Sequence, residues 1–216
     1  MARSLKKELF NLPNAITMAR IAMIPVILLF TYYESRANSF IAALLYAATS
    51  ATDFLDGWVA RRQGLTTVIG KFMDPLADKL VVVSALIMLV HLGRVPAWVV
   101  IVIMAREFIV TGLRTIAMSE GIVIAASQEG KYKTSLQLAG ISFLILHYSY
   151  PVDFLVRTVE IDSNRIGSLL LYLSLVLSLW SATRYVALFL KAVYRKDEEG
   201  EAAERAVEGP PSARGS

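Results

Sequence analysis

The chain alternates between long apolar runs and short polar segments. The runs cover residues 15–33, 39–60, 71–92, 96–118, 135–150 and 166–190. Each is close to the roughly 20 residues that an α-helix needs to cross the hydrocarbon core of a membrane, and the fifth is the shortest. The pattern therefore predicts an all-α integral membrane protein with six transmembrane helices.

The two ends of the chain depart from this pattern. Residues 4–12 combine large apolar side chains with two lysines, which is typical of a short amphipathic helix lying on a membrane surface. From about Arg195 the sequence is polar and has no apolar face, which favours disorder. We expect a membrane domain over residues 1–194 and a disordered cytoplasmic tail over residues 195–216.

Composition and charge agree with a membrane protein. Hydrophobic residues make up 56% of the chain and the net charge is +4. With six spans, most basic residues fall on one side, which should be cytoplasmic and in contact with anionic lipid headgroups. Both termini then face the cytoplasm. Nucleic acid is not an expected partner, because no basic patch is interleaved with exposed aromatic residues. The absence of cysteine excludes disulfides and thiolate metal sites.

Four aspartates, Asp53, Asp56, Asp74 and Asp78, interrupt the second and third apolar runs. A charged aspartate at mid-bilayer costs roughly 2.5–3.5 kcal/mol. Their spacings of three and four residues place each pair on one helix face, so two helices joined by a short turn can point the pairs at each other. A divalent cation would relieve both repulsion and desolvation. The alternative is an interfacial position, or pairing with the neighbouring cations Arg61, Arg62, Lys71 and Lys79.

The residue types at this cluster indicate phosphoryl chemistry. Hard carboxylate oxygens favour Mg²⁺ or Mn²⁺, and two such ions can clamp the oxygens of a phosphoryl group in transfer. Asp78 is either a ligand or the general base that deprotonates an acceptor hydroxyl, and we prefer the base role. Gly57, Ala60 and Gly70 have no bulk, so a planar base or a diphosphate can approach the helices. Close helix packing would also explain them.

A second group of charges lies in and after the fourth run. Arg106, Arg114, Lys131 and Lys133 can converge on an anionic group, and Glu107 can balance one of them. The alternative for Arg114, Lys131 and Lys133 is that they only mark the cytoplasmic side. Arg106 lies deeper in its run, and this alternative explains it less well.

The acidic run, Asp53-x2-Asp56-Gly57-x2-Ala60-Arg61-x8-Gly70-x3-Asp74-x3-Asp78, resembles the signature of the CDP-alcohol phosphatidyltransferases at every fixed position. Residues 11–20 and 106–134 also resemble bacterial members of that family. The resemblance implies a six-helix enzyme of the bacterial inner (cytoplasmic) membrane, usually a homodimer, with a cytoplasmic active site. Such an enzyme uses CDP-diacylglycerol and releases CMP.

The resemblance also implies roles by position. Asp53, Asp56 and Asp74 would hold the metal ions, and Asp78 would act as base and also as a ligand. The CDP pocket would be lined by Asp56, Gly57, Ala60, Arg61 and Gly70. The acceptor would be sn-glycerol 3-phosphate, with its phosphate bound by the basic cluster that extends from Arg106 to Lys133. Secondary candidates in the resembling segments are Asn14, Thr17, Arg20 and Thr111.

Other acceptors and one other class of protein are alternatives. The same chemistry could use inositol phosphate or phosphatidylglycerol as acceptor. A cation transporter also uses carboxylates within the membrane, but it would be expected to show broken helices in both halves of the chain. Here the four aspartates of the motif cluster in one third of the sequence.

Overall fold

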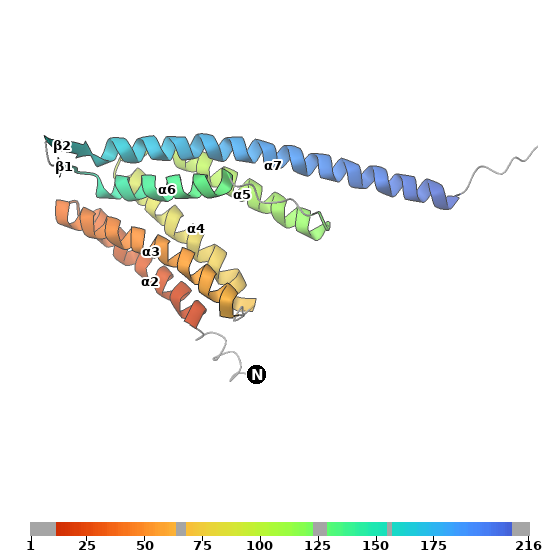
Figure 1. The fold of residues 1–216 in the computed structure, drawn as a ribbon, viewed down its shortest axis with the longest axis horizontal. Coiled ribbons are helices and arrows are strands. Elements are labelled where there is room, and N and C mark those ends of the chain that lie inside the picture. The colour runs from red at the N-terminus through yellow and green to blue at the C-terminus, as the bar shows by residue number, and fades with distance from the viewer. Residues whose placement is uncertain (1–11, 64–67, 123–128, 155–156, 209–216) are drawn as a thin grey trace, which may run out of the picture.

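The computed structural model describes residues 12–63, 68–122, 129–154 and 157–208 (Figure 1). The described chain is mostly helical. The helices are α2 (Leu12–Tyr32), α3 (Arg36–Gln63), α4 (Val68–His91), α5 (Ala97–Ser119), α6 (Glu129–Leu146) and α7 (Ser163–Glu208). The strands are β1 (Ser149–Phe154) and β2 (Arg157–Asp162). The predicted amphipathic helix at residues 4–12 lies almost wholly outside the described residues.

Each of the six described helices overlaps one of the six predicted apolar runs, and α6 is the shortest, as expected. Within the described residues, two segments are long and apolar enough to cross a membrane by length and composition, Asn14–Tyr32 and Ser163–Lys196. The mostly helical fold is therefore confirmed, and six membrane crossings stay a prediction.

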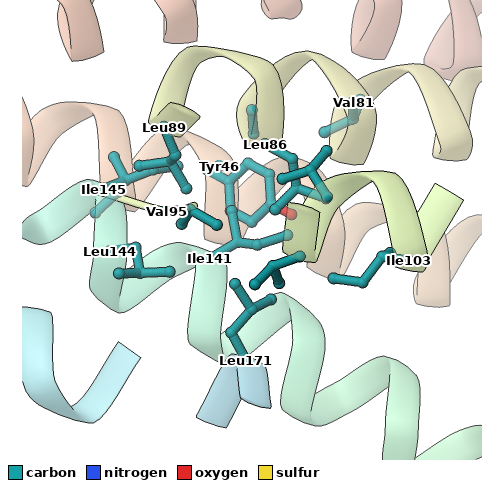
Figure 2. Packing of buried hydrophobic residues seen from close by; sticks show 14 of the residues in the cluster. Tyr46, Val81, Leu86, Leu89, Val95, Ile103, Ile141, Leu144, Ile145 and Leu171 are labelled. Carbon is teal, nitrogen blue, oxygen red and sulfur yellow. The ribbon is translucent and has the colours of Figure 1, made fainter. Parts of the chain in front are cut away.

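Helix α2 packs against both α3 and α4, while α6 packs against α3 and α7 (Figure 1). Buried apolar side chains fill the space between these helices, as Figure 2 shows around Tyr46 of α3 and Leu86 of α4. Ile141 of α6 and Leu171 of α7 extend the same cluster. Between helices in a membrane, such side chains stabilise the fold through van der Waals packing rather than through removal from water. One apolar core thus connects the helices that carry the aspartates to α6 and α7.

An antiparallel hairpin of β1 and β2 joins α6 to α7, which the sequence analysis did not predict. The fifth predicted span ended at residue 150, but α6 ends at Leu146 and β1 begins at Ser149. Residues 149–162 are rich in tyrosine, valine, isoleucine and threonine, which suit strands, and contain a proline that does not suit a helix. Asp162 then caps α7, because its Oδ1 accepts hydrogen bonds from the backbone N–H groups of Asn164 and Arg165.

At the end of the bundle near the hairpin, which we call the hairpin end, a buried arginine ties three connections together. Arg94 follows α4 and donates hydrogen bonds of 3.1 Å to the carbonyl oxygens of Leu144 and Ile145. It also donates to the Glu34 carboxylate between α2 and α3, at 3.1 Å. The last carbonyls of a helix have no partner within it, so Arg94 satisfies two of those left by α6.

Helices α6 and α7 approach closely at two glycines. A Cβ atom built on Gly140 would lie 2.9 Å from the Leu171 backbone nitrogen. A Cβ built on Gly167 would lie 2.8 Å from the Leu144 backbone nitrogen and 2.9 Å from the Gly140 carbonyl oxygen. Small residues allow such contact between helix backbones in membranes.

Helix α7 continues to Glu208, so residues 195–208, predicted to be disordered, are helical in the structure (Figure 1). The segment lacks an apolar face but is rich in alanine, glutamate, lysine and arginine, which have high helix propensity. Arg195 and Glu199 form an ion pair one helical turn apart. Lys196 bonds to the Glu120 carboxylate at 2.7 Å and thereby links the extension to the end of α5. Residues 209–216 lie outside the described part.

Candidate active site at the aspartate end of the bundle

The predicted acidic motif lies at the end of the bundle opposite the hairpin, which we call the aspartate end. Asp53 and Asp56 lie in the last turns of α3, and Asp74 and Asp78 lie in the first turns of α4. Residues three or four apart share a helix face, so each helix carries its two aspartates on one side. The side chains of Asp53, Asp56 and Asp74 lie outside the described residues, as do the surroundings of Gly57, Ala60, Arg61 and Gly70.

Asp78 is the member of the motif whose side chain is described, and it forms an ion pair with Arg20 of α2. The Arg20 side chain is 4% exposed and that of Asp78 is 40% exposed. A buried guanidinium needs a charged partner of this kind. Asp78 is therefore held by α2, while part of its side chain stays exposed.

Two secondary candidates occupy the same helix as Arg20. Asn14 and Thr17 are buried, at 2% exposure each, and lie six and three residues before Arg20, respectively. This spacing forms a polar stripe on a helix that is otherwise apolar. Helix α2 contacts both aspartate-bearing helices, and Arg20 is the member of the stripe with a described contact to the acidic motif.

Arg106 and Lys133 meet at one carboxylate, that of Glu107. Arg106 donates from Nη1 to Glu107 Oε1 at 2.8 Å, and Lys133 pairs with the same oxygen. Arg106 also donates from Nε to the Ser178 carbonyl oxygen of α7 at 3.0 Å. The expectation that Glu107 balances one cation is confirmed, and it balances two. This Glu107 network joins α5, α6 and α7.

The other predicted cations are placed differently. The Arg114 guanidinium carbon lies 5.9 Å from the centre of the Tyr185 ring on α7, within the range of a cation–π contact. The Lys131 side chain lies outside the described residues. Of the four cations expected to converge, the structure thus brings Arg106 and Lys133 together and places Arg114 on a different partner.

Thr111, a secondary candidate, is exposed and accepts a hydrogen bond of 2.8 Å from Lys79 Nζ. Sequence reasoning considered Lys79 only as a counter-ion for the aspartates. Its position directly after Asp78 turns it by about 100° around α4, toward α5. This rotation could have indicated from the sequence that Lys79 contacts α5 and is not a counter-ion of the aspartates.

Residues 10–180 match the family model described as CDP-alcohol phosphatidyltransferase. The chain is 47% identical over 151 residues to a CDP-diacylglycerol–glycerol-3-phosphate 3-phosphatidyltransferase of Bacillus subtilis, covering 64% of this chain and 78% of that one. It is 31% identical over 182 residues to the Haemophilus influenzae protein of the same name, covering 82% and 92%. A probable phosphatidylglycerophosphate synthase of Mycobacterium tuberculosis is 40% identical over 150 residues, covering 68% and 71%. With the family model spanning the acidic motif, the Arg20–Asp78 pair and the Glu107 network, the chain belongs to the CDP-alcohol phosphatidyltransferase family.

Proposed function

We propose that the chain transfers the phosphatidyl group of CDP-diacylglycerol to sn-glycerol 3-phosphate, giving phosphatidylglycerol phosphate and CMP. The observation that carries this is the match of residues 10–180 to the family, together with relatives whose names state this donor and acceptor. A site at helix ends suits such a reaction. One substrate lies in the bilayer, while the acceptor and the CMP product are soluble.

Asp78 is the residue that we assign as general base. The acceptor hydroxyl transfers its proton to the Asp78 carboxylate as the hydroxyl oxygen forms a bond to the lipid-side phosphorus. The bond between that phosphorus and the CMP oxygen breaks, and CMP leaves. Arg20 supports this role because its buried guanidinium holds the carboxylate in place while 40% of the Asp78 side chain stays exposed.

The donor set fits divalent cations. Four carboxylates on two helices supply the hard oxygen ligands that Mg²⁺ and Mn²⁺ prefer. Asp53, Asp56 and Asp74 would hold two such ions, with Asp78 as a further ligand. Bound there, the ions would neutralise charge on the phosphoryl oxygens. Gly57, Ala60, Arg61 and Gly70 would line the CDP pocket with Asp56.

The acceptor assay tests the proposed reaction. Purified protein in mixed micelles with CDP-diacylglycerol should release CMP and form a phosphorylated lipid when sn-glycerol 3-phosphate is added. Chelation with EDTA should stop the release and added Mg²⁺ should restore it. CMP release that depends on inositol phosphate or phosphatidylglycerol, but not on glycerol phosphate, would assign a different acceptor. A transporter would release no CMP with any of them.

Asp78→Asn tests the base. The substitution keeps the size of the side chain but removes the proton acceptor, so turnover should fall by roughly 10²–10⁴-fold while CDP-diacylglycerol still binds. Asp162→Asn is the matched control, because it makes the same chemical change at the N-terminus of α7, at the hairpin end. Near-normal turnover of Asp78→Asn would remove Asp78 from the base role.

The aspartate end should face the cytoplasm. The chain has no cysteine, so single cysteines introduced at Ser119 and Ser149 would label the two ends of the bundle without background. In intact cells, a membrane-impermeant maleimide should modify Ser149→Cys at the hairpin end and leave Ser119→Cys unmodified until the membrane is opened. The reverse pattern would invert the proposed orientation.

A further inference from the structure

Lys79 differs from Arg20, Arg106 and Lys133 in having no carboxylate partner among the described residues. Arg20 pairs with Asp78, and Arg106 and Lys133 share Glu107. Among the described residues, the hydrogen-bond partner of Lys79 is the Thr111 hydroxyl, at 2.8 Å. An ammonium group on a half-buried position of a membrane helix is costly unless an anion or water compensates it.

The charge around Lys79 is not neutral. Lys79 is close enough to Lys133 for the two positive charges to repel each other, and the charge of Arg106 also repels that of Lys133. Within this described set, the three cations Lys79, Arg106 and Lys133 lie near one carboxylate, that of Glu107, so the set carries two more positive than negative charges. A phosphate monoester carries a charge of about −1.5 to −2 at pH 7 and would balance that surplus.

We propose that Lys79 and Thr111 bind the phosphate group of the phosphorylated acceptor and so set the preference for acceptors that carry a phosphate. This inference rests on the proposed function. Lys79 donates to a phosphate oxygen, and the exposed Thr111 hydroxyl donates to a second one. The arginine and lysine of the Glu107 network add positive charge behind them. Asp78 is the preceding residue of α4, so the proposed base lies on the same helical turn as Lys79, about 100° around the helix axis.

The diphosphate of CDP-diacylglycerol offers similar chemistry, but it has another partner. Under the proposed function, divalent ions held by the aspartates neutralise the diphosphate. The acceptor phosphate has no ion assigned to it and therefore needs cations of the protein. Lys79 is one described residue that can supply a cation.

The test compares how substitutions change the KM for the acceptor and the KM for the donor. In Lys79→Gln, the KM for sn-glycerol 3-phosphate should rise roughly 10- to 100-fold, as expected for the loss of a charge-assisted hydrogen bond, while the KM for CDP-diacylglycerol changes less than twofold. Lys79→Arg should recover part of the loss. Lys191→Gln, which removes an exposed lysine of α7, is the control and should leave both constants unchanged.

Each other outcome overturns the inference. A rise in the KM for CDP-diacylglycerol alone would assign Lys79 to the diphosphate, and unchanged constants would remove it from the site. If Lys79→Gln does not fold, the comparison of Thr111→Val with Thr111→Ser decides. Valine should raise the acceptor KM about 3- to 10-fold and serine should not, and equal values for the two overturn the inference. Wild-type protein that transfers nothing to glycerol phosphate would refute the proposed function itself.

Discussion

Replacing Gly167 with alanine should separate α6 from α7. The added Cβ would lie 2.8 Å from the Leu144 backbone nitrogen, 2.8 Å from Leu144 Cγ and 2.9 Å from the Gly140 carbonyl oxygen. The Leu144 side chain can rotate, but the two backbone atoms cannot move without displacing α6. The substitution therefore acts on the distance between the helices.

Two effects of opposite sign determine the result. Alanine is more favourable than glycine inside a helix by about 1 kcal/mol. Forcing an extra carbon into a packed contact costs about 1–3 kcal/mol, and the upper part of that range applies where the obstacle is backbone. The difference predicts that Gly167→Ala lowers the free energy of unfolding by about 1–2 kcal/mol.

Thermal unfolding of the purified protein in detergent micelles measures this difference. Gly112→Ala is the control, because Gly112 lies in α5 with nothing within 4 Å of an added Cβ. There only the gain in helix propensity remains, so stability should stay level or rise by up to about 1 kcal/mol. If Gly167→Ala unfolds at or above the wild-type temperature, as the control does, the close approach of α6 and α7 does not limit stability and the reasoning is refuted.

Three further substitutions test contacts away from the reacting groups. Arg94→Met should destabilise the protein by about 3 kcal/mol, because it leaves two helix carbonyls and a carboxylate without their donor. Thermal unfolding compares it with Arg165→Gln, whose 89% exposed side chain should contribute less than about 0.5 kcal/mol. Equal losses for the two variants would contradict the prediction. Glu107→Gln should cost about 2–3 kcal/mol in the same measurement, since two buried cations lose their counter-ion, and wild-type stability would show that the network contributes little. Glu120→Gln should speed trypsin cleavage after Lys196 without changing phosphatidyl transfer, and unchanged cleavage would exclude this contact as the anchor. The hydrogen bond and charge of Lys196 hold the pKa of Glu120 below its usual value of 4.5, so in wild-type protein the anchor should persist at neutral pH and be lost as the pH falls through that lowered value.

The positions of the helices could be predicted from the sequence because long apolar runs have few alternatives in a membrane. The second run was expected over residues 39–60, and α3 spans Arg36–Gln63. The third was expected over residues 71–92, and α4 spans Val68–His91. The extra turn of α3 at the aspartate end, residues 61–63, is polar, so a reading of apolar runs alone leaves it out.

The hairpin and the α7 extension could not be predicted in this way. Residues 149–162 were divided between the end of one apolar run and a connection, and strand pairing depends on a partner that the local pattern does not identify. The α7 extension has good helix formers but no apolar face, and its anchor is Glu120, which is 76 residues away from Lys196. A hydropathy pattern does not identify a contact between two residues so far apart in the sequence.

The acidic motif could be found from spacing, but its partners could not. The Arg20–Asp78 pair spans 58 residues and the Lys79–Thr111 hydrogen bond spans 32. Which cation meets which carboxylate depends on how each helix is rotated about its axis, and a change of one residue turns a side chain by about 100°. Three-dimensional packing therefore separates Arg114 from Arg106 and Lys133, although all three were expected to bind one anionic group.

The contacts of α2 with both α3 and α4 affect the order in which the protein can assemble during translation. Arg20 enters the growing chain before any of the four aspartates, so each acidic helix is synthesised when a helix that can receive it already exists. At translation rates of roughly 5–20 residues per second, the unit ending at His91 precedes the end of α7 by several seconds. Assembly of the acidic motif during biosynthesis therefore has no need to wait for the C-terminal half of the protein.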